Sequence, residues 1–200
     1  MEQVTVDDKT LEYAPYPGFQ KSELFVFVGE KISITYVPQK PGEQRFDSEF
    51  IATYKILEPV YGEFDGRFVE FRVFDHYGIP RFAAFENVLL FIRKWGDDLH
   101  HVKFLFYDVY KTTDGKWASC RAPVPGSEHA RTNEPKPLTF REPVIFEIND
   151  PSRPFDENFF YPPYFEFEDG KAICKMGVYV SEVSYLIVTD LIETGRISGQ

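Results

Sequence analysis

The amino-acid sequence predicts an all-β domain with one or two short helices, and three observations support this class. Aromatic residues make up 18% of the 200-residue chain, with 21 Phe and 12 Tyr, and broad rings favour the half-buried surface of a pleated sheet. Short apolar segments alternate between apolar and polar residues with a period of two. Glycine, proline and aspartate separate these segments, as expected of strands joined by turns.

The first half of the chain contains the clearest strand signals. Residues 1–22 are polar and interrupted by prolines, which predicts an extended lead-in. Residues 24–28 are apolar and residues 31–36 alternate, which predicts one long strand with a bulge at Gly29 or two strands meeting there. Further strands are predicted around residues 52–56, 69–73, 88–92 and 101–110. The last of these is expected to place Val102, Phe104 and Phe106 on one face.

The second half is rich in loops. Asp114-Gly115 predicts a hairpin turn, and residues 144–148 and the two sides of Asp169-Gly170 predict short strands. In the tail we expect a strand at residues 184–188 and then a helical turn ending near Gly195. These signals predict a single domain with a lead-in (1–22), a small β-barrel core (23–120), a proline-rich loop (121–143) and a C-terminal β extension packed on the core (144–200).

The order of strands in the core resembles the netrin-like module, the barrel of oligonucleotide/oligosaccharide-binding (OB) type found in tissue inhibitors of metalloproteases. The similarity rests on FVFVGEKI (residues 25–32) followed by ATYKILEPVYGEF (52–64), and it covers roughly residues 23–110. Those inhibitors use an amino-terminal cysteine to bind the catalytic zinc, whereas this chain has no cysteine before Cys120. FDHYG (74–78) and YKTTDGKW (110–117) resemble uncharacterised bacterial proteins, which implies a bacterial origin.

The net charge of −10 disfavours nucleic acid and anionic membranes and suits a protein partner with a basic face. No apolar segment approaches the length of a membrane helix, so we expect no membrane insertion. The first residues show no signal peptide. The protein is therefore expected to be periplasmic or secreted if a leader has been removed, and cytoplasmic otherwise.

Residues with catalytic or metal-binding chemistry form no recognisable motif. His100 and His101 are adjacent, and neighbouring residues on a strand point to opposite faces, so we expect that the two do not share a metal ion. We also expect no cofactor. No serine lies in a nucleophile elbow. Cys120 and Cys174 form either one disulfide or two buried thiols, and the sequence leaves both alternatives open.

The densest aromatic cluster spans residues 159–165, and its candidate binding residues are Phe159, Phe160, Tyr161 and Tyr164. If exposed, these rings would form a patch that binds a protein or stacks on a sugar. If buried, they would close one end of the barrel. We favour burial, because several exposed rings would promote aggregation.

These observations support three hypotheses about function. The first is a non-enzymatic protein-binding module of the inhibitor or immunity type. The second is a cell-envelope β domain that binds carbohydrate or a small ligand. The third, with the least support, is a hydrolase with an unrecognised active site.

Overall fold

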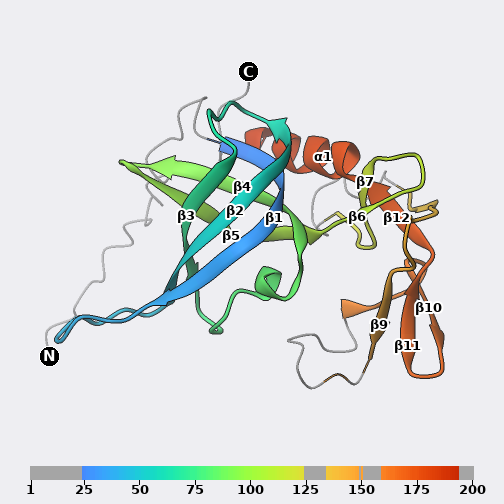
Figure 1. Ribbon diagram of the computed structural model, residues 1–200, viewed down its shortest axis with the longest axis horizontal. Helices are drawn as coiled ribbons and strands as arrows, with labels where there is room; N and C mark the ends of the chain where they lie inside the picture. The colour runs from blue at the N-terminus through green and yellow to red at the C-terminus, as the bar shows by residue number, and fades with distance from the viewer. Residues whose placement is uncertain (1–23, 124–133, 149, 151–158, 194–200) are drawn as a thin grey trace, which may run out of the picture.

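The barrel consists of five strands that close in the order β1-β2-β3-β5-β4 (Figure 1). A computed structural model describes residues 24–123, 134–148, 150 and 159–193. The predicted lead-in at 1–22 therefore lies outside the described residues. The barrel strands are β1 (Leu24–Val37), β2 (Ser48–Tyr61), β3 (Phe68–Asp75), β4 (Asn87–Trp95) and β5 (Asp98–Asp108). All neighbouring strands are antiparallel except β3 and β5, which run parallel.

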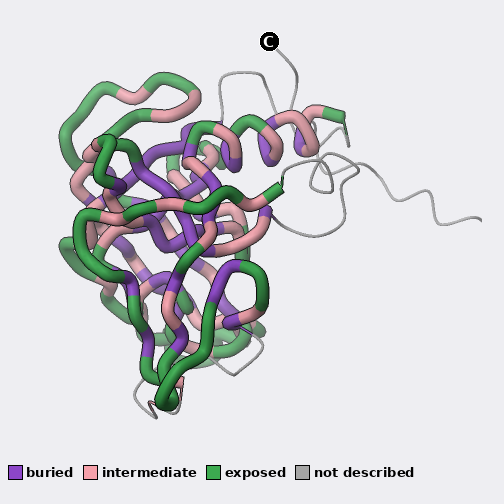
Figure 2. The backbone as a smooth tube through the Cα atoms, turned by 90° about the vertical axis from the view of Figure 1, so that its right-hand side faces the viewer, coloured by how far each residue is buried: buried purple, intermediate pink, exposed green. Residues whose placement is uncertain are grey.

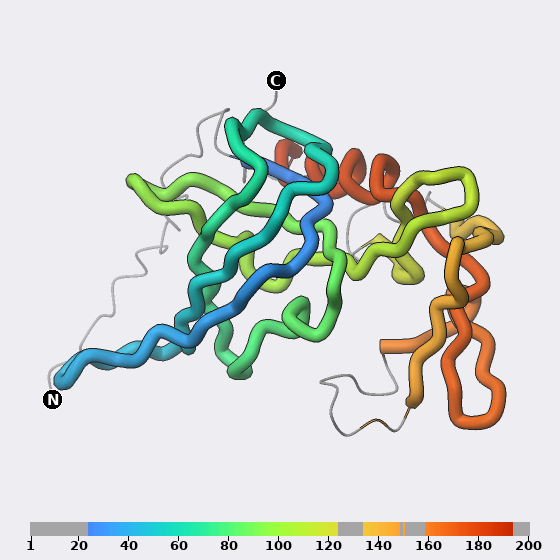
Figure 3. The backbone as a smooth tube through the Cα atoms, in the orientation of Figure 1, coloured from blue at the N-terminus to red at the C-terminus, as the bar shows by residue number. Residues whose placement is uncertain are grey.

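Strand β1 joins both sides of the barrel, because it pairs with β2 along one edge and with β4 along the other. It is one continuous strand. Its register against β2 shifts between Val28 and Gly29, in agreement with the bulge predicted at Gly29. A side-chain carbon at Gly29 would lie 2.7 Å from the ring of Phe27, so only glycine allows this ring to pack against the bulge. The β1–β2 hairpin then extends beyond the barrel wall (Figure 3).

The other barrel strands bury their apolar residues as predicted, with one exception in β5. Residues 88–92 of β4 are buried on both faces, and β3 alternates between buried and more accessible positions around Phe71. Buried segments gather in the interior of the molecule, and its outer loops are mostly exposed (Figure 2). In β5 the predicted alternation fails at Phe104, which has a positive φ of 65° and is exposed. Leu90 pairs with Phe106 and Ile92 with His101, so residues 102–105 bulge out of the ladder. This bulge turns Phe104 away from the core.

Two small sheets form the C-terminal extension beside the barrel (Figure 1). One has the order β6-β7-β12-β8 and the other the order β10-β11-β9. Because β6 and β7 pair within this extension, the barrel ends at Asp108, before the predicted boundary at residue 120. The described part of the proline-rich loop contributes β8. The strands of the extension are β6 (Tyr110–Lys111), β7 (Trp117–Ser119), β8 (Lys136–Pro137), β9 (Ile145–Glu147), β10 (Phe165–Glu168), β11 (Lys171–Cys174) and β12 (Met176–Tyr179).

Residues 180–193 are helical, which corrects the predicted strand at residues 184–188. The predicted end of a helical turn near Gly195 lies outside the described residues. Helix α1 (Val180–Glu193) buries Val183, Ile187 and Leu191 on one face, at the spacing of one helical turn. The carboxylate of Glu182 in its first turn accepts a hydrogen bond from the backbone N–H of Tyr179. The β-branched residues suggested a strand, but burial of one helical face outweighs their weak intrinsic preference. Within the described residues, no helix is long and apolar enough to cross a membrane.

Cys120 and Cys174 form a disulfide, so of the two alternatives that the sequence leaves open, the disulfide is correct and the pair of buried thiols is not. Cys120 directly follows β7 and Cys174 ends β11, so the bond joins the two small sheets of the extension. The Cα atoms of the two cysteines lie 5.9 Å apart, and 54 residues separate them in the sequence.

We expect reduction of this disulfide to lower the free energy of unfolding by about 4 kcal/mol, because the bond restricts a long loop of the unfolded chain. Denaturant unfolding with and without reductant measures this difference. Thiol titration of the unfolded, unreduced protein should find no free thiol, and two free thiols would contradict the bond. The variant with both cysteines changed to serine should match the reduced protein.

Gly62 provides a second test of the fold, because it has a φ of +78° and packs against the first residue of β1. A side-chain carbon at this position would lie 2.2 Å from the backbone oxygen of Leu24. We expect Gly62→Ala to destabilise the protein by about 2–4 kcal/mol in denaturant unfolding, from backbone strain and this clash together.

Gly42 is the matched control, because it has a similar φ of +81° and no neighbour within 4 Å. Gly42→Ala should cost only about 1 kcal/mol, the strain of the left-handed backbone alone. Equal effects of the two substitutions would contradict the close approach of Leu24 to Gly62.

Candidate binding site

The rings predicted as a candidate binding patch are largely buried. Phe159, Phe160 and Tyr164 belong to the hydrophobic core, and Tyr161 is half-buried. Phe160 packs against Phe146 and Phe165 of the extension, and Phe159 stacks on Phe85 of the β3–β4 connection with 6.1 Å between ring centres. The buried interpretation is confirmed, and the exposed binding patch is wrong. Phe159 joins the extension to the barrel through Phe85 and also lines the pocket described below.

A different set of rings is exposed at one end of the barrel. Phe46, His76, Tyr77 and Phe104, which we call the aromatic strip, contact one another in that order, with ring centres 4.4, 5.3 and 6.0 Å apart. Phe46 is 85% exposed, Tyr77 81% and Phe104 57%, and the neighbouring Ile79 is 71% exposed. A contiguous exposed cluster of this kind marks an interaction surface more strongly than single exposed rings do.

Three separate segments bring the aromatic strip together. Phe46 comes from the β1–β2 connection, His76 and Tyr77 follow β3, and Phe104 lies in the β5 bulge. The carboxylate of Asp75 accepts a hydrogen bond from the backbone N–H of Tyr77 at 2.8 Å, which fixes the turn after β3. Lys103 pairs with Asp47 at 2.7 Å, and its ammonium group also lies 5.2 Å from the centre of the Phe104 ring.

Charged residues fix the β1–β2 connection that carries Phe46. The half-buried Arg45 donates a hydrogen bond to the backbone oxygen of Val37 at 3.0 Å and pairs with Glu49. Glu49 also pairs with Arg72 of β3, and Arg72 in turn pairs with Asp98 of β5 at 3.0 Å. This chain of ion pairs ties the loop end of the hairpin to β3 and β5 of the barrel.

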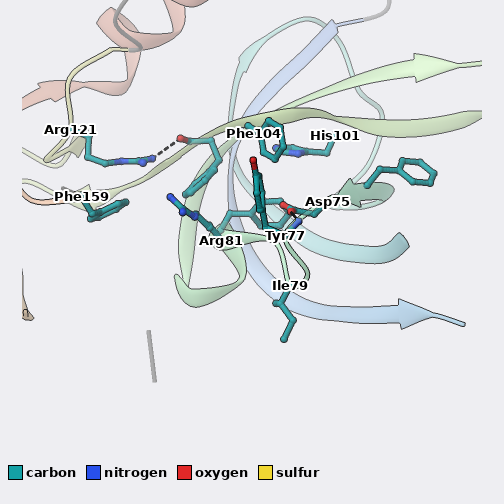
Figure 4. A pocket seen from close by; sticks show the side chains of 11 residues that line it. Asp75, Tyr77, Ile79, Arg81, His101, Phe104, Arg121 and Phe159 are labelled. Carbon is teal, nitrogen blue, oxygen red and sulfur yellow. Dashed lines mark hydrogen bonds between the residues drawn. The ribbon is translucent and has the colours of Figure 1, made fainter. Parts of the chain in front are cut away.

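Beside the aromatic strip lies a pocket of about 560 Å³ between the barrel and the extension (Figure 4). Tyr77 and Phe104 of the strip form part of its wall. The described residues that line it are Phe74, Asp75, Tyr77, Ile79, Arg81, Phe82, His101, Phe104, Phe106, Arg121 and Phe159. A cavity of this size, with mostly aromatic walls and few polar groups, has the character of a ligand-binding pocket.

Arg121 forms the wall of the pocket on the side of the extension. Its guanidinium group pairs with the fully buried carboxylate of Asp108 at 2.9 Å and donates a hydrogen bond to the backbone oxygen of Phe106 at 2.6 Å. It also lies 4.9 Å from the centre of the Phe159 ring, within the range of a cation–π contact. Arg121 therefore serves to hold the barrel and the extension together.

His101 forms the buried side of the pocket, and its ring closes the β5 bulge. The Nε2 atom lies 3.0 Å from the backbone oxygen of Leu105, so Nε2–H donates to that oxygen. The ring packs against Phe82 with 4.8 Å between centres. His100 lies instead on the outer face, where it stacks on Phe74. The two histidines thus point to opposite faces, as predicted.

The described side chains around the pocket are mostly apolar or already engaged. No cluster of three or more metal-ligating side chains occurs among the described residues. The pocket lining offers no serine, threonine or cysteine as a nucleophile. Burial also keeps His101 neutral, with its Nε2–H engaged by a backbone oxygen. The site is therefore a largely apolar cavity with Arg81 at its margin and the aromatic strip beside it.

Comparison with known proteins yields no relative: no family model, curated protein or solved structure matches the chain.

The buried His101 predicts a specific dependence of stability on pH. Burial lowers the pKa of His101 from 6.5 to about 4. The unfolded chain therefore binds a proton at a higher pH than the native protein, and native stability falls as the pH drops from 6.5 towards 4. We expect this residue to account for a loss of roughly 3 kcal/mol over that window, measured by denaturant unfolding at a series of pH values.

His101→Gln is the control, because its side-chain amide can donate a hydrogen bond and does not titrate. The variant should lose less stability than the wild type between pH 6.5 and 4. Parallel pH profiles for the two proteins would show that His101 is not buried in its neutral form.

Proposed function

We propose that this chain is a non-catalytic protein-binding module of the inhibitor or immunity type, which docks its partner on the aromatic strip. The observation that carries this proposal is the continuous row of exposed rings from three segments, in which His76 joins Phe46 to Tyr77 and Tyr77 contacts Phe104. Large apolar residues are normally buried, so maintaining such a surface calls for a partner. Aromatic residues and arginine also dominate the binding energy at protein interfaces, and Arg81 lies beside these rings.

We further propose that the barrel is of the OB type. The closed order β1-β2-β3-β5-β4, with β3 parallel to β5, supports this assignment. OB barrels bind their ligands on the β2–β3 face and the adjacent loops, and Phe46 and His76 lie where β2 begins and β3 ends. The bulge at Gly29 and the β2 strand that follows support the netrin-like variant, without the zinc-binding cysteine of the inhibitors.

The net charge supports a further inference about the partner, and the disulfide supports one about the compartment of this protein. The net charge of −10 favours a partner with a positive overall charge and disfavours nucleic acid. The disulfide supports an oxidising compartment, such as the periplasm or the extracellular space, because cytosolic thiols are kept reduced.

Carbohydrate or small-ligand binding is the second candidate, and the pocket of about 560 Å³ favours it. Exposed rings stack on sugar faces as readily as they pack against a protein surface. Glycan-array screening distinguishes the two functions, because specific sugar binding that requires Tyr77 would support carbohydrate binding over protein binding. Hydrolysis has weaker support, since the pocket lining provides no nucleophile beside His101.

The aromatic strip is tested by a variant that carries Tyr77→Ser and Phe104→Asn. Asparagine accepts the positive φ of residue 104, so the backbone is preserved. In affinity capture from a native lysate, we expect the wild type to retain a stoichiometric protein and the double variant to bind it at least roughly tenfold more weakly, because two central rings are lost.

Tyr185→Ser is the matched control, because Tyr185 is 71% exposed on α1 and belongs to no part of the strip. It should retain the partner at the wild-type level. Unfolding curves check that all variants are folded. If wild type and double variant retain the same proteins in equal amounts, the aromatic strip is not the docking surface.

A further inference from the structure

Arg81 is held at the margin of the pocket by a fixed backbone. It begins a short 3₁₀ helix, η1 (Arg81–Ala84), whose next residue, Phe82, is buried in the core. The ammonium group of Lys31 on β1 donates a hydrogen bond to the backbone oxygen of Ala83 at 2.6 Å. The backbone N–H of Lys31 bonds to the oxygen of Glu86 at 2.8 Å. The backbone of Arg81 is thus positioned before any ligand arrives.

The charge of Arg81 is uncompensated within the described part of the chain, where it forms no ion pair and no side-chain hydrogen bond. The other arginine of the pocket lining is already engaged, because Arg121 neutralises the buried Asp108. Asp75 keeps its negative charge and accepts the backbone N–H of Tyr77 through Oδ1. Figure 4 shows Asp75 and Arg81 on opposite sides of the Tyr77 ring. Among the described residues that line the pocket, Arg81 is therefore the cationic group available to a ligand anion.

The space next to this guanidinium group is apolar. Ile79, Phe104 and Phe106 line the pocket together with Phe82 and Phe159. A volume of about 560 Å³ accommodates a large side chain together with part of its backbone. A guanidinium group beside such a cavity matches a ligand that combines a ring with a carboxylate.

We propose that the pocket binds an acidic, aromatic peptide segment of the partner, with the aromatic side chain in the cavity and the adjacent carboxylate paired with Arg81. This inference rests on the proposed protein-binding function and specifies what the partner presents. The partner as a whole can still be basic, because the pocket requires a carboxylate only at this one contact. The aromatic strip supports the flanking residues of the bound segment.

A pair of peptides tests the proposal with the full chain. The probes are acetyl-Gly-Phe-Asp-Gly-amide and acetyl-Gly-Phe-Asn-Gly-amide, which differ only in the charge of one side chain. In NMR titrations at neutral pH, we expect the aspartate peptide to bind roughly tenfold more tightly, as a charge-assisted hydrogen bond would provide. Arg81→Gln should reduce the affinity for the aspartate peptide to that of the asparagine peptide.

Arg67→Gln is the matched control, because Arg67 is exposed on the β2–β3 connection and is not part of the pocket lining. This variant should bind both peptides like the wild type. Equal affinities of the wild type for the two peptides, or no binding of either, would overturn the proposal. The proposed function has its own test, since capture of a partner through Tyr77 and Phe104 can succeed while the peptide preference fails.

Discussion

The ion pair between Asp108 and Arg121 is the interaction on which the arrangement of the whole molecule depends. Asp108 ends the last barrel strand, and its side chain has no exposed surface. A carboxylate in that environment requires a counter-charge, because burying an unpaired ion costs several kcal/mol. Arg121, which follows the first strands of the extension, provides it at 2.9 Å. The same guanidinium group contacts the rings of Phe106 and Phe159, so one side chain joins the barrel to the extension and forms a wall of the pocket.

The abundance of rings in the sequence serves two separate purposes in the structure. Most rings, such as Tyr54 with Phe71 inside the barrel and Phe146 with Phe160 in the extension, fill the core. A smaller number are exposed. Those of the aromatic strip lie in connections or in the β5 bulge, whereas Tyr36, Phe68 and Phe167 are exposed on the outer faces of strands. The distinction depends on backbone geometry. A ring on the inner face of a strand is buried, whereas a ring on the outer face, in a turn or in a bulge has no second sheet to cover it.

The sequence predicts the strands of the barrel well, because their alternation reflects burial on one face, as at Val69 and Phe71. It misplaces Phe104, because a bulge interrupts the period of two and leaves no local signal in the residues around it. It also assigns α1 partly to a strand, since the packing that stabilises this helix comes from distant residues. The candidate binding site cannot be predicted from the sequence for the same reason: Phe46 contacts His76, and Tyr77 and Arg81 line one pocket, only after the barrel closes. The FDHYG segment that contains His76 and Tyr77 stood out in the sequence, but nothing there indicated its neighbours.

The placement of the aromatic strip outside the strand ladders has a consequence for how this protein can change over evolutionary time. Phe46, Tyr77 and Phe104 contribute no side chain to the buried core and sit on connections or a bulge whose backbone is fixed by other residues. Substitutions at these positions therefore alter the surface without loosening the barrel. Descendants of one ancestral gene could thus acquire different partners through a few exchanges of this kind, while the same scaffold continues to fold.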